Sequence, residues 1–232
     1  MRKSIRASAI DLWRGTRGTL VFLGLMLVFR SAFADWVEVP SGSMNPTVID
    51  GDRVLIDKRA YGVRMPFTTR HLIDIGAPQR GDVVVLESPE NGITLLKRVI
   101  AVPGDTVAMQ NEGLIVNGVA ARYEVLPVET GMALLSGVRA LNPVYVQEEL
   151  PGVSHATMRL PQVEARRNFS AIKIPAGHYL VMGDNRDNSH DSRYFGLVRR
   201  EAIFGRAVRV VVSLDPENHY LPRRGRWLTP AL

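Results

Sequence analysis

Residues 94–105 read TLLKRVIAVPGD, an apolar run that carries Lys97 and Arg98 and ends in a strong turn signal. Alternate side chains of a strand point to opposite faces, so Leu95, Lys97 and Val99 would share one face. Shorter β-type runs lie on both sides of this segment, at residues 36–39, 53–56, 82–86, 113–116, 172–174, 178–182 and 207–212. Turn residues separate them at intervals typical of barrels and sandwiches. The pattern predicts a mainly β domain over residues 35–232.

Residues 120–170 are less regular than the segments around them. They mix charged residues with proline and glycine and show no clear strand or helix period. We therefore expect an inserted lobe or long loops there.

The N-terminal region carries the strongest apolar segment. Residues 18–29 read GTLVFLGLMLVF, and the stretch 18–34 reaches the short limit for a membrane-spanning helix. Five basic residues and one acidic residue precede it. The positive-inside rule then predicts a cytoplasmic basic N-terminus over residues 1–17, a single-pass transmembrane anchor over 18–34, and a domain outside the cytoplasmic membrane.

Two alternatives remain for this region. Ala32-Phe33-Ala34 is an A-x-A sequence after an apolar run, which is typical of a cleavable signal peptide. Arg30 stands between the run and that sequence and weakens this interpretation. A buried core helix would also fit residues 20–29, but the dense basic flank argues against it.

The composition excludes several classes of site. The 232 residues include no cysteine, so no disulfide, thiolate metal site or thiol nucleophile is available. The net charge is +6, but the basic residues form no stripe interleaved with aromatic residues. The basic cluster in residues 2–17 suits anionic lipid headgroups. The expected partner is therefore membrane lipid and not nucleic acid.

A serine-rich segment, residues 40–47, reads PSGSMNPT. By itself it predicts a turn. A serine nucleophile needs a base, and none of the five histidines lies in a motif that ties it to Ser43. There is also no G-x-S-x-G elbow.

Lys97 is the other candidate base. A free lysine titrates near pH 10.4, so it must be desolvated to accept a proton at neutral pH. Leu95 and Val99 on the same strand face could desolvate it. The alternative is an edge-strand lysine that faces water and blunts sheet pairing.

Residues 183–194 read GDNRDNSHDSRY and follow the expected strand 178–182. Such a polar stretch predicts a hydrogen-bonded loop. A calcium loop is the alternative, but the two arginines and the missing glutamate fit it poorly. We therefore predict no metal and no cofactor.

Four segments together resemble the type I signal peptidase family in order and spacing: residues 40–47, 80–84 (RGDVV), 97–105 and 183–193. The anchor segment that ends Phe29-Arg30-Ser31, just before the serine-rich segment, also resembles that family. The resemblance implies an antiparallel β catalytic domain of the signal-peptidase type, preceded by one transmembrane helix. It implies a serine endopeptidase of the cytoplasmic membrane that removes signal peptides from exported preproteins.

The resemblance also implies a role for each catalytic residue. Ser43 would be the nucleophile, and Lys97 would be the general base. The Ser41 hydroxyl and the Ser43 backbone N–H would form the oxyanion hole, and Ser189 would hold the Lys97 amine. The loop would be braced by two ion pairs, Asp184 with Arg98 and Asp191 with Arg193.

Substrate choice follows from the same resemblance. The family cuts after small residues at positions −1 and −3, and shallow apolar pockets would exclude larger ones. The matching wall residues are Val39, Met44 and Leu96. We expect the substrate to lie as an added strand between residues 36–40 and 94–97.

Other functions stay open at this stage. A pilus-processing or conjugation-linked Ser/Lys peptidase would keep the same residues but act on one dedicated substrate. Self-cleaving repressors also use serine and lysine, but they carry a helix-turn-helix domain and no anchor. A non-catalytic, membrane-tethered binding protein on the same scaffold is the alternative of another class.

Overall fold

The computed structural model describes residues 16–27, 34–64, 71–127 and 142–231. Residues 16–27 form a helix that precedes the β domain in the chain. Within these described ranges, the helices are too short or too polar to cross a membrane. The predicted anchor, residues 18–34, lies partly outside them, because residues 28–33 are not described.

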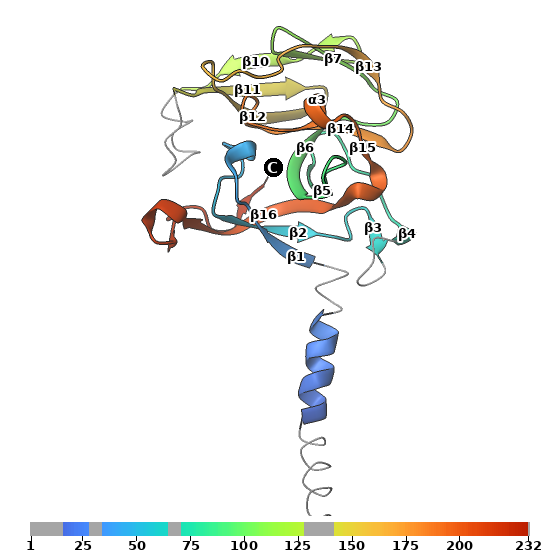
Figure 1. Ribbon diagram of the computed structural model, residues 1–232, viewed down its shortest axis with the longest axis vertical. Coiled ribbons are helices and arrows are strands. Elements are labelled where there is room, and N and C mark those ends of the chain that lie inside the picture. Colours follow the sequence, from blue (N-terminus) through green and yellow to red (C-terminus); the bar gives the residue numbers. More distant parts are fainter. Residues whose placement is uncertain (1–15, 28–33, 65–70, 128–141, 232) are drawn as a thin grey trace, which may run out of the picture.

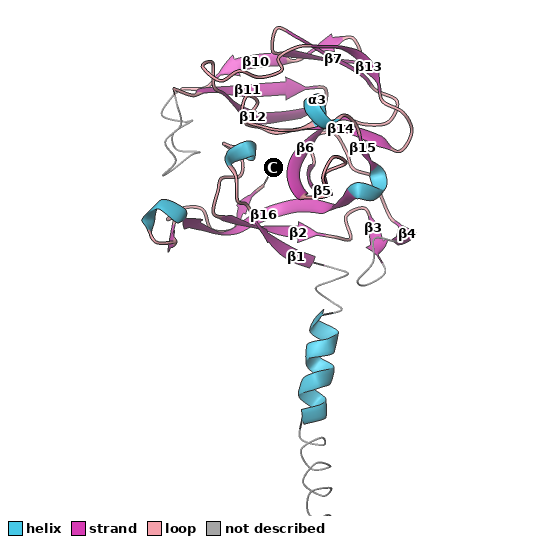
Figure 2. Ribbon diagram, in the orientation of Figure 1, coloured by secondary structure: helices cyan, strands magenta, loops and turns pink. Residues whose placement is uncertain are grey.

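The main sheet is antiparallel and curled, as Figure 1 shows. Its strand order is β1 (Ala34–Glu38), β2 (Asp52–Asp57), β16 (Ile203–Asp215), β5 (Val83–Glu87), β6 (Thr94–Ala101), β14 (His178–Met182) and β15 (Val198–Arg199). Two short strands, β17 (Leu221–Pro222) and β18 (Thr229–Pro230), also pair with β16. The mainly β prediction is confirmed, and strands dominate the described chain in Figure 2.

Three smaller sheets complete the β structure. A four-stranded sheet contains β13 (Phe169–Lys173), β7 (Thr106–Gln110), β8 (Gly113–Val116) and β9 (Val119–Ala120). The lobe sheet contains β10 (Arg122–Val125), β11 (Val144–Leu150) and β12 (Val153–Arg159). A hairpin is formed by β3 (Gly62–Arg64) and β4 (His71–Asp74). The short helices of the domain are η1 (Gly42–Met44), α3 (Ser192–Phe195), η2 (Arg200–Ala202) and η3 (Pro216–Asn218).

The lobe sheet is more regular than the sequence suggested. Strands β11 and β12 pair without interruption from Val144↔Arg159 to Leu150↔Val153. The apolar alternation was hidden because Glu148, His155 and Thr157 occupy buried positions that hydrophobic residues normally fill. Polar side chains at buried positions removed the period on which strand prediction depends.

The core lies between the curled main sheet and the segments that it encloses. One apolar cluster contains Val39, Met44, Val85 and Ala207, with Leu96 packed against it. This cluster joins the segment after β1 to β5, β6 and β16. It therefore places the serine-rich turn directly beside strand β6.

Strand β6 has two halves with different surroundings. Residues 94–98 of it pair with β5, from Glu87↔Thr94 to Val83↔Arg98. Its second half also pairs with β14, at Met182↔Arg98, Val181↔Val99 and Leu180↔Ala101. Lys97 lies at the boundary between the two halves.

Candidate active site

Ser43 lies in the short helix η1, which begins directly after the extended residue Ser41. The next side chain, Met44, is completely buried in the core and anchors the turn. Two hydrogen bonds from Asn185 hold the turn from the other side. The Asn185 backbone N–H donates to the Ser43 carbonyl at 3.1 Å, and its Nδ2 donates to the Gly42 carbonyl at 3.0 Å.

Lys97 approaches Ser43 from strand β6. Its Nζ lies 2.8 Å from Ser43 Oγ and 3.0 Å from the Leu96 carbonyl oxygen. The side chain is nearly inaccessible to solvent, at 2% exposure. Burial lowers the pKa of Lys97 to about 8, although the nearby carboxylates of Asp191 and Asp184 oppose this shift. An amine with this pKa can take a proton from the Ser43 hydroxyl near neutral pH.

Arg98, the next residue of β6, points into an ion pair with Asp184. Its Nε and Nη2 each donate to a different carboxylate oxygen of Asp184 at 2.8 Å, and its Nη1 donates to the Gly81 carbonyl at 2.7 Å. The Thr47 hydroxyl donates to the same carboxylate at 2.5 Å. Burial would raise the pKa of Asp184, but the charge and hydrogen bonds of Arg98 hold it below its ordinary value.

Asp191 and Arg193 form the second bidentate pair, with two contacts of 2.8 Å. Asp191 also caps helix α3 and accepts a hydrogen bond from the Gly183 backbone N–H at 3.0 Å. Burial raises the pKa of Asp191, but its bonds to Arg193 outweigh that effect and lower it overall. This carboxylate therefore joins both ends of the polar loop.

Asp187, the remaining acidic residue of the loop, also has partners within the protein. Asp187 Oδ2 accepts a hydrogen bond from the Leu160 backbone N–H, and its Oδ1 pairs with Arg167 at 3.1 Å. The acidic residues of the loop thus have arginine and backbone partners. This explains why a segment with three aspartates follows a buried strand.

The two other predicted hydroxyls lie near Ser43 but differ in environment. Ser41 is exposed and lines the same pocket as Ser43. Ser189 Oγ is buried and, in the described part of the chain, no group hydrogen-bonds to it, including the Lys97 amine. It lies close enough to Asp191 to help lower the pKa of that carboxyl group, without reaching hydrogen-bond geometry. A side chain added at Gly183 would stand 2.3 Å from Ser189 Oγ and 2.4 Å from the Ser43 carbonyl oxygen.

An apolar pocket of about 250 Å³ opens beside Ser43 and Lys97. All three residues expected to shape a substrate pocket, Val39, Met44 and Leu96, line it. The segment after β1 contributes one wall, and the first half of β6 contributes another. This arrangement can accept an extended peptide with a small apolar side chain next to the reactive hydroxyl.

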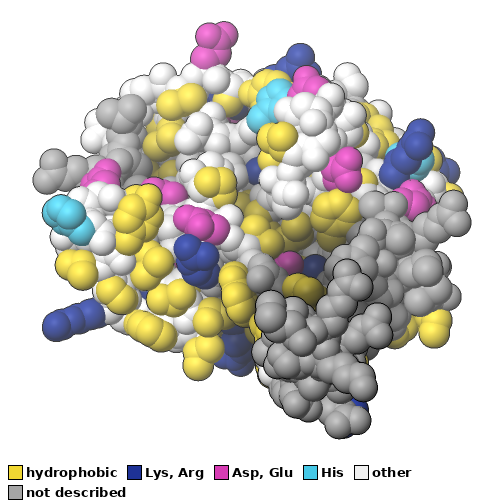
Figure 3. All heavy atoms as spheres, turned by 60° about the horizontal axis from the view of Figure 1, so that its bottom comes forward, with side chains coloured by type: hydrophobic (Ala, Val, Ile, Leu, Met, Phe, Trp, Pro, Cys, Tyr) yellow, Lys and Arg dark blue, Asp and Glu magenta, His cyan; other side chains and the backbone are white. Residues whose placement is uncertain are grey.

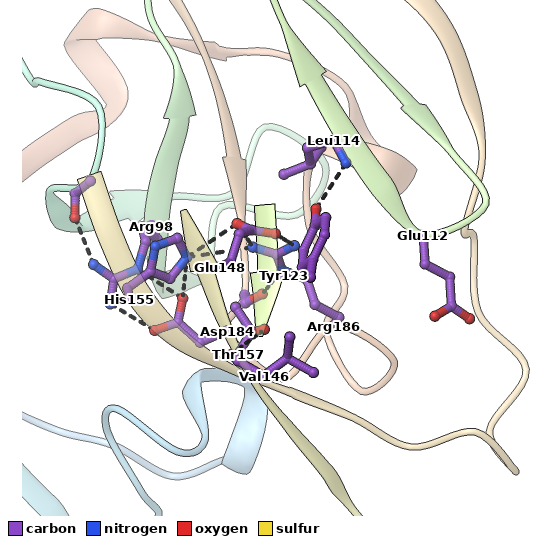
Figure 4. Close-up of polar contacts among 12 residues, drawn as sticks. Arg98, Glu112, Leu114, Tyr123, Val146, Glu148, His155, Thr157, Asp184 and Arg186 are labelled. Carbon is purple, nitrogen blue, oxygen red and sulfur yellow. Dashed lines mark hydrogen bonds and ion pairs between the residues drawn. The ribbon is translucent and has the colours of Figure 1, made fainter. Parts of the chain in front are cut away.

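Sequence reasoning missed several residues that contact the site. Asn185 and Thr47 lie within the segments already singled out, and their polar side chains could have drawn attention to them. Arg186 is bonded to Glu148, which lies in the lobe sheet, and His155 stands beside this pair (Figure 4). Nothing local in the sequence links Glu148 or His155 to the loop.

Known proteins are similar to this chain over most of its length. The family described as "Signal peptidase, peptidase S26" matches residues 13–212. Signal peptidase I of Pseudomonas aeruginosa is 39% identical over 221 residues, covering 88% of this chain and 74% of that protein. Signal peptidase I of Pseudomonas fluorescens is 36% identical over 217 residues, with the same two coverages. A crystal structure of a signal peptidase I from Enterococcus faecalis is 32% identical and covers 57% of this chain and 98% of that one, with a TM-score of 0.34.

The family match covers most of the chain, and the two Pseudomonas relatives are similar to it over 88% of its length. The chain belongs to the type I signal peptidase family, peptidase S26, and is a serine endopeptidase.

Proposed function

We propose that this protein is a membrane-bound peptidase that removes N-terminal signal peptides from exported preproteins, with Ser43 as nucleophile and Lys97 as general base. The observation that carries the proposal is the 2.8 Å contact between the Lys97 amine and the Ser43 hydroxyl, in a buried setting that lowers the amine's pKa. A buried neutral amine is the base that a serine nucleophile needs when no histidine serves it.

The reaction begins when neutral Lys97 accepts the proton of Ser43 Oγ. The oxygen attacks the carbonyl carbon of residue −1, and the resulting oxyanion accepts hydrogen bonds from the Ser43 backbone N–H and the Ser41 hydroxyl. The carbon–nitrogen bond then breaks while protonated Lys97 gives its proton to the leaving amine. An acyl-enzyme on Ser43 remains. Lys97 next takes a proton from the water that attacks its carbonyl carbon, and returns that proton to Ser43 Oγ as the ester bond breaks.

The supporting residues keep this geometry. Asp184 with Arg98 and Asp191 with Arg193 brace the loop that packs against the Ser43 turn, through contacts of 2.8 Å. Ser189 lies beside the same turn, and we assign it to orienting the Lys97 amine during turnover. An uncharged amine lacks an ion-pair partner and benefits from such a hydroxyl.

The pocket supports cleavage after small residues at positions −1 and −3. Its walls of Val39, Met44 and Leu96 are apolar and lie beside Ser43, which suits small apolar side chains. The substrate would lie as an added strand between residues 36–40 and 94–97. Backbone hydrogen bonds would give affinity, and the pocket would give specificity.

We further propose that residues 18–34 anchor the protein, with residues 1–17 in the cytoplasm and residues 35–232 on the outer side of the cytoplasmic membrane. On the helix 16–27, Leu20, Phe22 and Leu25 are exposed. On the domain, Trp36 and Trp227 are more than half exposed. Figure 3 shows many hydrophobic side chains on the face that Figure 1 has at the bottom, where β1 lies. Exposed tryptophans of this kind are typical of membrane interfaces.

The test uses the full chain, purified in detergent, and a preprotein whose signal peptide ends in A-x-A. We expect a shorter product whose new N-terminus, read by mass spectrometry, follows the second alanine. Ser43→Ala should give no product. A matched preprotein with phenylalanine at position −1 should remain intact.

The absence of a product from the unaltered chain would reject the proposal. If the chain then still bound the preprotein, it would be a binding protein on a peptidase scaffold. Cleavage that ignores the residue at position −1 would reject the specificity but keep the peptidase.

A further inference from the structure

A buried ion pair connects the lobe sheet to the loop of residues 183–193. Glu148 lies on β11 with 0% exposure, and Arg186 lies in the loop with 3% exposure. The two terminal nitrogens of Arg186 contact the two carboxylate oxygens of Glu148 at 2.5 Å each. The approach is bidentate, as Figure 4 shows, so it fixes the orientation of both side chains.

Arg186 is also tied into the loop itself. Its Nε donates to the Gly183 carbonyl at 3.2 Å, and its own carbonyl accepts a hydrogen bond from Arg193 at 2.6 Å. Its backbone N–H donates to the Met158 carbonyl of β12 at 2.9 Å, and the Met158 N–H donates to the Asp184 carbonyl at 2.9 Å. Residues 183–186 are therefore held against the lobe sheet by backbone and side-chain contacts.

The same short segment holds the nucleophile. Asn185, between the ion-paired residues Asp184 and Arg186, donates its two hydrogen bonds to the carbonyls of Ser43 and Gly42. A shift of residues 183–186 would move these donors and, with them, the Ser43 turn. The path from Glu148 to Ser43 contains Arg186 and Asn185 and is continuous.

His155 of β12 lies between two ion pairs, Glu148 with Arg186 and Asp184 with Arg98. Its Nε2 lies 3.4 Å from a Glu148 carboxylate oxygen and 3.9 Å from one of Asp184. Burial, with the adjacent Arg98 charge, lowers the pKa of His155 to about 4, so the ring is neutral under ordinary conditions. Two arginines and two carboxylates thus balance in charge around a neutral ring.

We propose that Glu148 is a positioning residue for catalysis: through Arg186 it sets the placement of residues 183–186 and thereby that of Ser43. Glu148 lines no wall of the pocket beside Ser43. The lobe sheet is then part of the catalytic machinery and not an appendage. This inference rests on the proposed Ser43/Lys97 mechanism.

The test is Glu148→Gln in the full chain, which keeps the shape of the side chain but removes its charge. The readout is the single-turnover rate constant of preprotein cleavage with enzyme in excess, because a first-order rate does not depend on the fraction of folded enzyme. A misplacement of about 1 Å can cost on the order of a hundredfold, so we expect a drop of about tenfold to a hundredfold. KM should stay within about twofold, because the pocket walls are unchanged.

Two further variants make the result decisive. Glu149→Gln is the matched control, since Glu149 is the next residue of β11, loses the same charge and is exposed to solvent. It should keep the full rate constant. The double variant Glu148→Met/Arg186→Met replaces the buried pair with apolar side chains, a change that often leaves stability intact. We expect it to unfold near the temperature of the unaltered chain yet to remain slow.

The outcomes separate this inference from the function beneath it. If the unaltered chain cleaves the preprotein and Glu148→Gln keeps the full rate constant, the positioning role is wrong while the peptidase stands. Recovery of the rate constant in the double variant would likewise overturn it. If the unaltered chain cleaves nothing, the proposed function itself fails.

Discussion

Lys97 can serve as a base only while its amine is uncharged, and burial lowers its pKa to about 8. The neutral fraction therefore increases as pH rises through about 8, and the acylation rate should increase with it. We expect the rate constant to rise between about pH 6 and pH 9 and then to level off. Cleavage assays at several pH values across this range measure the rate constant. A flat profile, or a midpoint near the free-lysine value of about 10.4, would contradict a desolvated base.

Gly183 illustrates how little room surrounds Ser43. A Cβ at this position would lie 2.3 Å from Ser189 Oγ and 2.4 Å from the Ser43 carbonyl oxygen. The carbonyl oxygen belongs to the backbone, so it cannot move away without moving the Ser43 turn. Gly183→Ala should therefore displace Ser43 and reduce kcat on the order of a hundredfold. Gly76→Ala is the control, since its Cβ would meet only the Ala60 carbonyl oxygen, at 3.2 Å. Equal activities of the two variants would show that the turn can adapt.

At the scale of elements, the polar loop depends on buried ion pairs. Asp191 bonds to Arg193 and to the Gly183 backbone, so Asp191→Asn leaves the guanidinium of Arg193 buried without its partner charge. We expect a loss of about 3–5 kcal/mol in the free energy of unfolding, measured by urea denaturation.

The exposed pair of Arg53 and Glu38 provides the comparison for that loss. Arg53→Gln should change the free energy of unfolding by less than about 1 kcal/mol. If both substitutions cost the same, the buried pair does not brace the loop.

Strand prediction succeeded where burial followed hydrophobicity. Strands β5, β6 and β14 were visible because apolar residues occupy most of their positions, although β6 also buries Lys97 and Arg98. Strands β11 and β12 were hidden because Glu148, His155 and Thr157 occupy some of their buried positions. A buried charge is tolerated only with a partner, and the partner of Glu148 lies 38 residues away, beyond the reach of a local pattern.

For the whole molecule, His155 makes stability depend on pH. Its folded pKa of about 4 lies below its ordinary value of 6.5, so folding favours the neutral ring. The stabilisation is complete above about pH 6.5 and is lost as pH falls toward 4, at up to roughly 1.4 kcal/mol per pH unit. The groups that face this ring are Glu148 from β11, Arg98 from β6, and Asp184 and Arg186 from the loop.

Thermal or urea unfolding at several pH values between about 4 and 7 measures this slope. His155→Gln removes the titrating group and should flatten it, even if the variant is less stable at every pH. An unchanged slope in this variant would assign the acid sensitivity to other groups. The carboxylates with lowered pKa values, Asp184, Asp191 and Glu148, add their own losses at still lower pH.

Residue types and their order along the chain were enough to recognise the mainly β domain and to select Ser43, Lys97 and the loop of residues 183–193. Local alternation and turn chemistry depend only on near neighbours, which the sequence states directly. The tertiary structure alone brought the Lys97 amine to 2.8 Å from Ser43 and removed it from water. It alone also connected Glu148 to Ser43 through Arg186 and Asn185. Burial and charge pairing arise between segments far apart in the chain, and these set the pKa values and distances on which the proposed mechanism depends.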